Sequence, residues 1–184
     1  FHRDIGQSAG NVYWADTGVG GGWSARGGDL IVTLEGDAAL NWSDAGAGFN
    51  NRETLIFNSE YADSLVELTN PIDLGNETDR RIHIQNNTSI ESDRVRLSGT
   101  LSGTGAWNAT QLRLGDARER NFKNTLIEFT GTNTYSRRTV LRGGALYAID
   151  GVGLPTNSTL LFQSGDSVND EAVLLTSGTF TRDI

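Results

Sequence analysis

Cysteine and methionine are both absent from this chain of 184 residues, and only 2 prolines occur. Without cysteine, neither a disulfide nor thiol chemistry can contribute to the fold or the function. A chain that starts at Phe1 and lacks methionine is expected to be a processed product or a part of something longer. No signal peptide is recognisable, and no run of about 18 apolar residues predicts a membrane-spanning helix.

Positive charge is also scarce. Lys123 is the only lysine, and the formal net charge is −8 with a pI near 4.7. Nucleic-acid binding needs a basic stripe that displaces counterions from phosphates, whereas the arginines here are scattered among acidic residues. We therefore expect no nucleic-acid partner and a surface that repels like-charged neighbours.

Glycine, asparagine, serine and threonine are plentiful and separate short apolar stretches, some of them β-branched, which is typical of many short strands. The expected strands are Asp29–Leu34, Thr54–Phe57, Leu65–Leu68, Arg81–Ile84, Arg94–Leu97, Gln111–Leu114, Thr125–Phe129, Thr139–Leu141, Ala145–Ile149, Thr159–Phe162 and Ala172–Leu175. The best helix candidate, Asp116–Asn124, has no apolar face and is predicted to be a polar loop or a single turn.

Sandwiches, barrels, propellers and solenoids can all accommodate strands this dense. Two features favour a parallel β-solenoid. The polar turn residues are spread evenly, and tight hairpin signals are rare, the one Asp-Gly being Asp150-Gly151. A coil of about 20–25 residues, stacked at about 4.8 Å, would give roughly seven to nine coils. Valine, leucine and isoleucine would then stack inward, asparagine and threonine would bridge the corners, and Gly143-Gly144 would provide a turn with positive φ.

The two ends of the sequence match. Phe1-His2-Arg3-Asp4-Ile5 and Phe180-Thr181-Arg182-Asp183-Ile184 agree at four of five positions, at an offset of 179 residues. This self-similarity predicts that the chain is one period of a tandem array, in which each copy continues into the next.

The second half resembles the autotransporter-associated β-strand repeat of large bacterial surface proteins. The segments that carry this resemblance are Leu97-Ser98-Gly99-Thr100-Leu101-Ser102-Gly103-Thr104-Gly105, Phe129-Thr130-Gly131-Thr132-Asn133-Thr134-Tyr135-Ser136, Thr139-Val140-Leu141-Arg142-Gly143-Gly144-Ala145-Leu146, Leu154-Pro155 and Ser158-Thr159-Leu160. Arg137 and Arg138 stand where the family has two glycines. The first half is similar to the segment between such blocks, notably at Ala62-Asp63-Ser64, Asn70-Pro71-Ile72-Asp73-Leu74 and Gly178-Thr179-Phe180-Thr181-Arg182.

This resemblance implies an all-β, right-handed parallel β-helix displayed outside a bacterial cell, and it implies no enzymatic activity. Residues 1–184 would form a single unit, with 1–90 as the segment between blocks and 91–184 as the repeat-like part. The expected function is a structural repeat of an extracellular fibre, stalk or adhesin, whose copies join end to end. Two alternatives remain open: a separate subunit that assembles non-covalently from head to tail, and a carbohydrate-binding module.

The sequence contains few residues that could form a catalytic or metal site. His2 and His83 are the only histidines, and both are predicted to face solvent, His83 because it alternates with Ile82 and Ile84. Two acidic clusters could hold calcium, but neither has the spacing of a known calcium loop. They comprise Asp166, Asp170 and Glu171, and Asp73, Glu77 and Asp79.

Paired carboxylates, as in pectin-cleaving β-helix enzymes, would have to be Asp170 with Glu171 or Glu91 with Asp93. The first two residues point to opposite strand faces, and the second two lie beside Arg94 and Arg96. We therefore predict no catalytic, cofactor or metal site.

Aromatic side chains provide the other candidate for binding, since their faces stack on sugar rings. They comprise Trp14, Trp23, Trp42, Trp107, Tyr13, Tyr61, Tyr135 and Tyr147. The favoured interpretation is that they cover the core or pack between neighbouring fibres. N-x-S/T triplets, which accept glycans where the source has that machinery, occur at Asn41, Asn76, Asn86, Asn87, Asn108 and Asn157.

Overall fold

The computed structural model contains only strands and one short 3-10 turn in the part of the chain that it describes. The described residues are 1–15, 20–42, 49, 54–76, 79–87, 89–90, 93–104, 111–114, 125–163 and 172–182. Sixteen strands and the turn η1 (Glu35–Asp37) lie within these ranges, with no α-helix among them. A helix long and apolar enough to cross a membrane is likewise absent from these ranges. The predicted all-β class is confirmed.

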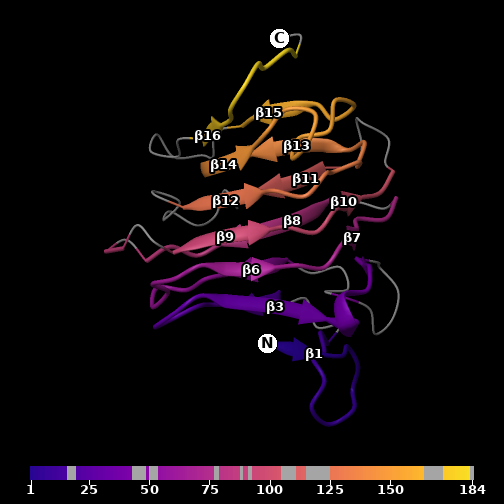
Figure 1. Ribbon diagram of the computed structural model, residues 1–184, viewed down its shortest axis with the longest axis vertical. Coiled ribbons are helices and arrows are strands. Elements are labelled where there is room, and N and C mark those ends of the chain that lie inside the picture. The colour runs from indigo at the N-terminus through magenta and orange to yellow at the C-terminus, as the bar shows by residue number, and fades with distance from the viewer. Residues whose placement is uncertain are drawn as a thin grey trace.

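The largest sheet has seven strands, all parallel, which run from one end of the molecule to the other (Figure 1). In spatial order they are β1 (His2–Arg3), β3 (Leu30–Leu34), β6 (Val66–Leu68), β9 (Arg94–Leu97), β12 (Leu126–Phe129), β14 (Gly144–Ala148) and β16 (Ala172–Leu175). Spatial order equals chain order, so each strand pairs with the one that the chain formed on its previous visit to the sheet.

Two further parallel sheets complete the structure. The six-stranded sheet contains β2 (Gly21–Trp23), β5 (Leu55–Phe57), β8 (Arg80–Ile84), β11 (Gln111–Leu114), β13 (Arg138–Leu141) and β15 (Leu160–Phe162). The three-stranded sheet contains β4 (Leu40–Asn41), β7 (Ile72–Asp73) and β10 (Leu101–Ser102). From β3 to β11 the chain visits the seven-stranded, three-stranded and six-stranded sheets in turn, three times over. From β12 onward it alternates between the two larger sheets.

All eleven stretches predicted as strands are strands, within one or two residues at each end. The predicted spacing of 20–25 residues is wrong for most of the chain. Leu30 pairs with Val66, 36 positions later, and Val95 pairs with Ile127, 32 positions later. Toward the C-terminus the spacing shortens, to 19 between Ile127 and Leu146 and 21 between Val140 and Leu161, before it returns to 28 between Leu146 and Leu174. One reason for the longer spacing is that the earlier visits include a strand of the three-stranded sheet and its connections, which the sequence pattern did not reveal.

The core is one hydrophobic cluster that extends between the sheets from Trp14 to Leu154. Its regularity comes from register, because side chains that face inward stack on their counterparts in the paired strand. One column contains Val66, Val95, Ile127 and Leu146, and the next contains Leu68, Leu97, Phe129 and Ala148. All eight are at most 2% exposed, as the predicted inward stacking requires.

Asparagine side chains bind the backbone where strands end, as expected. Asn70 Oδ1 accepts from the Leu34 amide at 2.8 Å, and Asn70 Nδ2 donates to the Leu34 and Ala38 carbonyls at 2.6 and 2.9 Å. Asn133 repeats the arrangement with the Leu101 amide, at 2.7 Å. Both asparagines are buried, so they satisfy backbone groups that water cannot reach. Gly144, for its part, has a φ of 68°, as predicted for that turn.

Candidate functional site

The acidic residues proposed for calcium do not form a site among the described residues. Asp73 Oδ1 accepts from the Gly75 amide at 2.9 Å, and Asp79 forms an ion pair with Arg113. Glu77 lies outside the described residues, as does the entire second cluster of Asp166, Asp170 and Glu171. Within the ranges that the structure describes, no three side chains of histidine, aspartate or glutamate gather around a common point.

The prediction that His83 faces solvent was wrong: this side chain is 5% exposed. His83 does lie on the face opposite Ile82, but that face of the six-stranded sheet is covered in part: Val140 on β13 is fully buried, whereas Arg81 is exposed. Alternation along a strand shows which face a residue occupies and not whether that face meets water. His2, by contrast, is exposed as expected.

Asp93 is a buried carboxyl group whose described partners are the backbone of Asn87 and the side chain of Asn58. Its Oδ2 accepts from the Asn87 amide at 3.0 Å, and its backbone carbonyl accepts from Asn58 Nδ2 at 3.0 Å. Burial raises the pKa of Asp93, although the bond from Asn87 opposes that shift. Its intended partner, Glu91, lies outside the described residues.

Most described tryptophans belong to the core. Trp42 is fully buried and Trp14 is 6% exposed. Phe49 contacts both rings edge-on, with centroid distances of 6.0 and 5.2 Å. Trp23 continues this series toward the N-terminal end, 5.6 Å from Trp14. The favoured interpretation, that aromatic residues cover the core, holds for these side chains and for the buried Tyr135. Trp107 lies outside the described residues.

A groove of about 260 Å³ opens beside this aromatic series at the N-terminal end, lined by residues 12–15 and 20–23. Tyr13, which is 43% exposed, and Trp23 present ring surface there. None of the described residues in the groove lining has a charged side chain. Ring stacking without charge is compatible with a sugar, and equally with another apolar surface.

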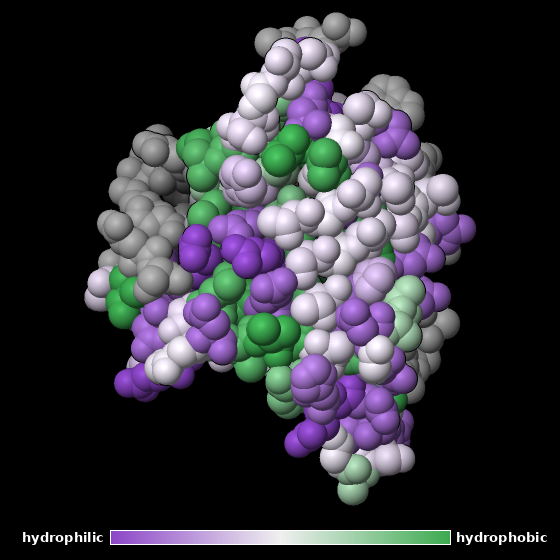
Figure 2. All heavy atoms as spheres, in the orientation of Figure 1, coloured by the Kyte–Doolittle hydropathy of each residue, from purple (hydrophilic) through white to green (hydrophobic). Residues whose placement is uncertain are grey.

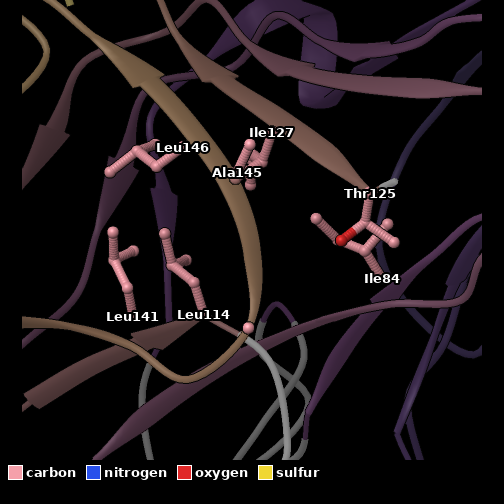
Figure 3. A pocket seen from close by; sticks show the side chains of 8 residues that line it. Ile84, Leu114, Thr125, Ile127, Leu141, Ala145 and Leu146 are labelled. Carbon is pink, nitrogen blue, oxygen red and sulfur yellow. The ribbon is translucent and has the colours of Figure 1, made fainter. Parts of the chain in front are cut away.

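A small cavity between the two larger sheets has an almost entirely apolar lining among the described residues (Figure 3). Its volume is about 10 Å³, and among the described lining residues Thr125 alone has a polar side chain. The close-up shows leucine, isoleucine and alanine side chains around it. A space this small is at the lower limit for one water molecule and is too small for a substrate.

The C-terminal end carries the most developed polar arrangement. There the chain leaves β16 and projects beyond the last strands (Figure 1). Arg182 turns back, and its Nε and Nη2 both lie 2.7 Å from Asp150 Oδ1. The same guanidinium donates to the carbonyls of Leu154, Pro155 and Ser158. Beside it lies a groove of about 510 Å³, lined in part by Leu160, Phe162, Leu174 and Phe180.

Sequence reasoning did not identify Asp150 as a binding residue, noting it only as part of an Asp-Gly turn. The sequence contained one part of the signal, because Arg182 belongs to the repeated end motif. The other part, a spacing of about 30 positions between paired strands, became known only from the structure, and it agrees with the separation of 32 between Asp150 and Arg182.

The surface between the two ends carries no comparable site among the described residues. Hydrophilic and hydrophobic residues are interleaved on the face shown in Figure 2. One ordered feature is a charged row across three strands, in which Arg96 lies between Glu67 and Glu128.

No protein-family model, no curated protein and no solved structure matches the chain.

Proposed function

We propose that the chain is a structural repeat, a right-handed parallel β-solenoid whose copies stack end to end in an extracellular bacterial fibre, stalk or adhesin. We call one passage of the chain around the sheets, from a strand of the seven-stranded sheet to the next strand of that sheet, a circuit. The repeating order of visits to three parallel sheets supports a solenoid, because each circuit adds one strand to each sheet that it visits, next to the strand of the circuit before. The resemblance to autotransporter-associated β-strand repeats supports the bacterial surface location and a role without catalysis.

The observation that carries the proposal is the placement of the two end motifs. At the start of the chain, His2 pairs with Thr33, one circuit and 31 positions later. At the end, Thr181 donates to Asp150 and Arg182 pairs with it, 31 and 32 positions earlier. Residues 181–182 therefore lie about 31 positions after the chain segment that they contact, and His2 lies 31 positions before the residue with which it pairs. That is the placement expected if residue 180 occupies the position of Phe1 in a following copy.

The edges of the seven-stranded sheet support stacking. β1 pairs only with Thr33 and Leu34, so no strand lies beside residues 30–32 of β3 on that side among the described residues, where the Phe1 ammonium donates to the Ile31 carbonyl at 2.7 Å. Within the same described ranges, β16 pairs with β14 and with no second strand. The column of inward-facing side chains that contains Val66, Val95, Ile127 and Leu146 starts at Leu30 and ends at Leu174. In a stack, Leu30 of a following copy would lie next to Leu174 and continue this column.

Exposed apolar side chains at both ends support the same arrangement. Phe1 is 44% exposed near the N-terminal end. Phe162, which is in register with the buried Leu141, is 51% exposed near the C-terminal end. Repeat arrays need terminal caps, and internal copies bury such surfaces against their neighbours.

A protein with two successive copies, residues 1–179 followed by 1–184, tests the proposal. Six strand spacings separate β1 from Arg182, counted through β3, β6, β9, β12, β14 and then Arg182. At about 4.8 Å each, a second copy is expected to lengthen the particle by about 30 Å without widening it. Small-angle X-ray scattering measures this directly. Two compact particles joined by a flexible link would contradict the proposal.

The length of the native polypeptide separates the covalent array from the non-covalent subunit. A denaturing gel of the native product, together with the sequence of its gene, gives that length. Copies repeated every 179 residues support the array, and a mature product near 20 kDa supports the subunit that assembles from head to tail.

The N-terminal groove favours carbohydrate binding as a second candidate, because Tyr13 and Trp23 present ring surface there among described lining residues that have no charge. A glycan array probed with the single copy tests it. Binding that Tyr13→Ala abolishes would support this function, and signals at background would remove it.

A further inference from the structure

The residues around Arg182 form a binding site built by other parts of the chain. Asp150 and Leu154 form an isolated parallel bridge, and the turn between them is closed by the Gly151 amide, which donates to the Leu154 carbonyl at 2.8 Å. Ser158 is fixed separately, because its Oγ donates to the Arg137 carbonyl at 2.8 Å. None of these contacts involves Arg182. We call the Asp150 carboxylate and the carbonyls of Leu154, Pro155 and Ser158 the arginine seat.

The arginine seat matches a guanidinium in charge and in geometry. One carboxylate balances the cation, and three carbonyls accept from the remaining N–H groups, at 2.9 Å for Leu154 and 2.7 Å for Pro155. The side chains of Arg182 and Asp150 are 13% and 7% exposed, so water competes little for these bonds. A planar donor with five N–H groups fits several acceptors at once, whereas the compact ammonium of lysine does not.

Phe180 gives the seat an apolar neighbour. The Arg182 guanidinium lies 5.9 Å from the Phe180 ring centroid, and Phe180 lines the groove with Leu160 and Leu174. The first motif already has the same internal arrangement, with Arg3 5.6 Å from the Phe1 ring centroid. A segment of the form Phe-x-Arg therefore supplies both the guanidinium that binds the arginine seat and the aromatic ring that lines the adjacent groove.

We propose that the arginine seat is the recognition site that joins one copy of this chain to the next, and that its ligand is the segment Phe1–Arg3 of the following copy. The inference rests on the proposed function and names the contact through which stacking is held in register. In this chain, residues 180–182 occupy the seat. The side chain of Arg3 is exposed, and its described contacts are with His2 and Phe1, so Arg3 is available to a neighbouring copy.

Occupancy of the seat can be tested in the full chain. In Arg182→Gln the cation is removed while the segment stays in place. A pentapeptide with the sequence of residues 1–5, added up to millimolar concentration, is then expected to shift the NMR amide signals of Gly151 and Val152. The same peptide with glutamine in place of arginine is expected to bind at least tenfold more weakly, since hydrogen bonds to charged groups contribute about that much or more.

Matched variants make the test specific. Asp150→Asn introduced into Arg182→Gln is expected to remove the arginine preference. The unsubstituted chain is expected to bind the peptide more weakly than Arg182→Gln, because its own tethered segment competes. Equal binding of both peptides, binding unaffected by Asp150→Asn, or no shift at millimolar peptide would each overturn the proposal. A double-mutant cycle of Arg182→Gln and Asp150→Asn in thermal unfolding adds an internal check, because additive effects would also overturn it.

The result is distinguishable from the fate of the proposed function. If a two-copy protein is a continuous rod but binding of the peptide shows no preference for arginine, end-to-end stacking is supported and the arginine seat as its recognition site is refuted. If the peptide binds as expected but the two copies are flexibly linked, the recognition site is supported and continuous stacking is refuted.

Discussion

Tyr135 shows how individual polar side chains are accommodated in an interior this narrow. Its hydroxyl lies 2.8 Å from Thr139 Oγ1, which lies 2.9 Å from Ser158 Oγ, and Ser158 donates to the Arg137 carbonyl. Burial raises the pKa of Tyr135 to about 12, against an ordinary value of 10.0. A chain of hydroxyls that ends on a carbonyl gives each oxygen a partner, which is why these groups are tolerated in the core.

Tyr135→Phe is expected to reduce the free energy of unfolding by about 1 kcal/mol near pH 7, the usual contribution of one hydrogen bond. A second effect depends on pH. The unfolded chain releases the phenolic proton near pH 10, whereas the folded chain holds it to about pH 12, so the native protein loses stability across that interval. Tyr135→Phe removes this loss. Urea unfolding at pH 7 and pH 11 measures both effects, with Tyr13→Phe, at an exposed position, as the control. Parallel pH profiles for Tyr135→Phe and the native chain would contradict the expectation.

Gly131 marks a place where two circuits approach too closely for a side chain. A Cβ at this position would lie 2.4 Å from the Gly99 carbonyl oxygen, which belongs to backbone and cannot move aside cheaply. Gly131→Ala is expected to lower the Tm by about 5–15 °C, from a loss of a few kcal/mol at typically 2–4 °C per kcal/mol. Thr130→Ala, at the exposed neighbouring position, serves as the control. A Tm for Gly131→Ala equal to that of the control would show that the backbones can separate.

At the scale of secondary-structure elements, the register between three neighbouring strands places three charged side chains in one row across the sheet. Glu67, Arg96 and Glu128 are paired positions on β6, β9 and β12. Arg96 Nε lies 2.7 Å from Glu128 Oε2, and Arg96 Nη1 lies 3.5 Å from Glu67 Oε2. Opposite charges directly across paired strands stabilise the sheet, and a shift of one residue would break every contact. The bond to Glu128 is the main reason that the pKa of Arg96 is raised.

Arg96→Gln is expected to reduce the free energy of unfolding by about 1.5–3 kcal/mol, because it leaves the nearly buried Glu128 carboxylate with a weaker partner. Glu128→Gln added to Arg96→Gln is expected to recover part of that loss, because the nearly buried carboxylate is then neutral, while the charges left without these partners, Arg94 and Glu67, are more exposed. Chemical denaturation of both single variants and the double variant measures the coupling. Effects that simply add would show that the row contributes no interaction energy.

The sequence was sufficient to predict strands wherever alternation lasts for three residues or more. It missed β4, β7 and β10, which have two residues each, too few to show a period. β1 has the same length, and β2 (Gly21–Trp23) is mostly glycine. The missing three-stranded sheet explains part of the error in spacing. His83 and Asp150 could not be assigned correctly for a different reason: burial and recognition depend on which segments lie one circuit away, and a single-sequence pattern does not contain that distance.

At the scale of the whole molecule, each circuit contacts chiefly the circuits before and after it, as the parallel registers require. Stability in such a structure is approximately a sum over circuits and the interfaces between them, so the first and last circuits are the least stable. The end circuits here have exposed apolar side chains, including Phe1 at 44% and Phe162 at 51%. Covering one such pair of ends should therefore stabilise the fold more than adding an unrelated domain would.

A two-copy protein is accordingly expected to unfold at a higher Tm than the single copy, because one interface between circuits is added and two exposed ends are buried in it. The transition should remain single, since neighbouring circuits across the junction are coupled like those within a copy. Differential scanning calorimetry of the one-copy and two-copy proteins at equal mass concentration measures both quantities. The matched control carries Phe162→Lys in the first copy only, which places a charge in the junction and is expected to return the Tm toward the single-copy value. The same substitution in the second copy lies at the free end and should leave the gain intact. An unchanged Tm in the two-copy protein, or equal effects of the two substitutions, would show that the ends do not meet.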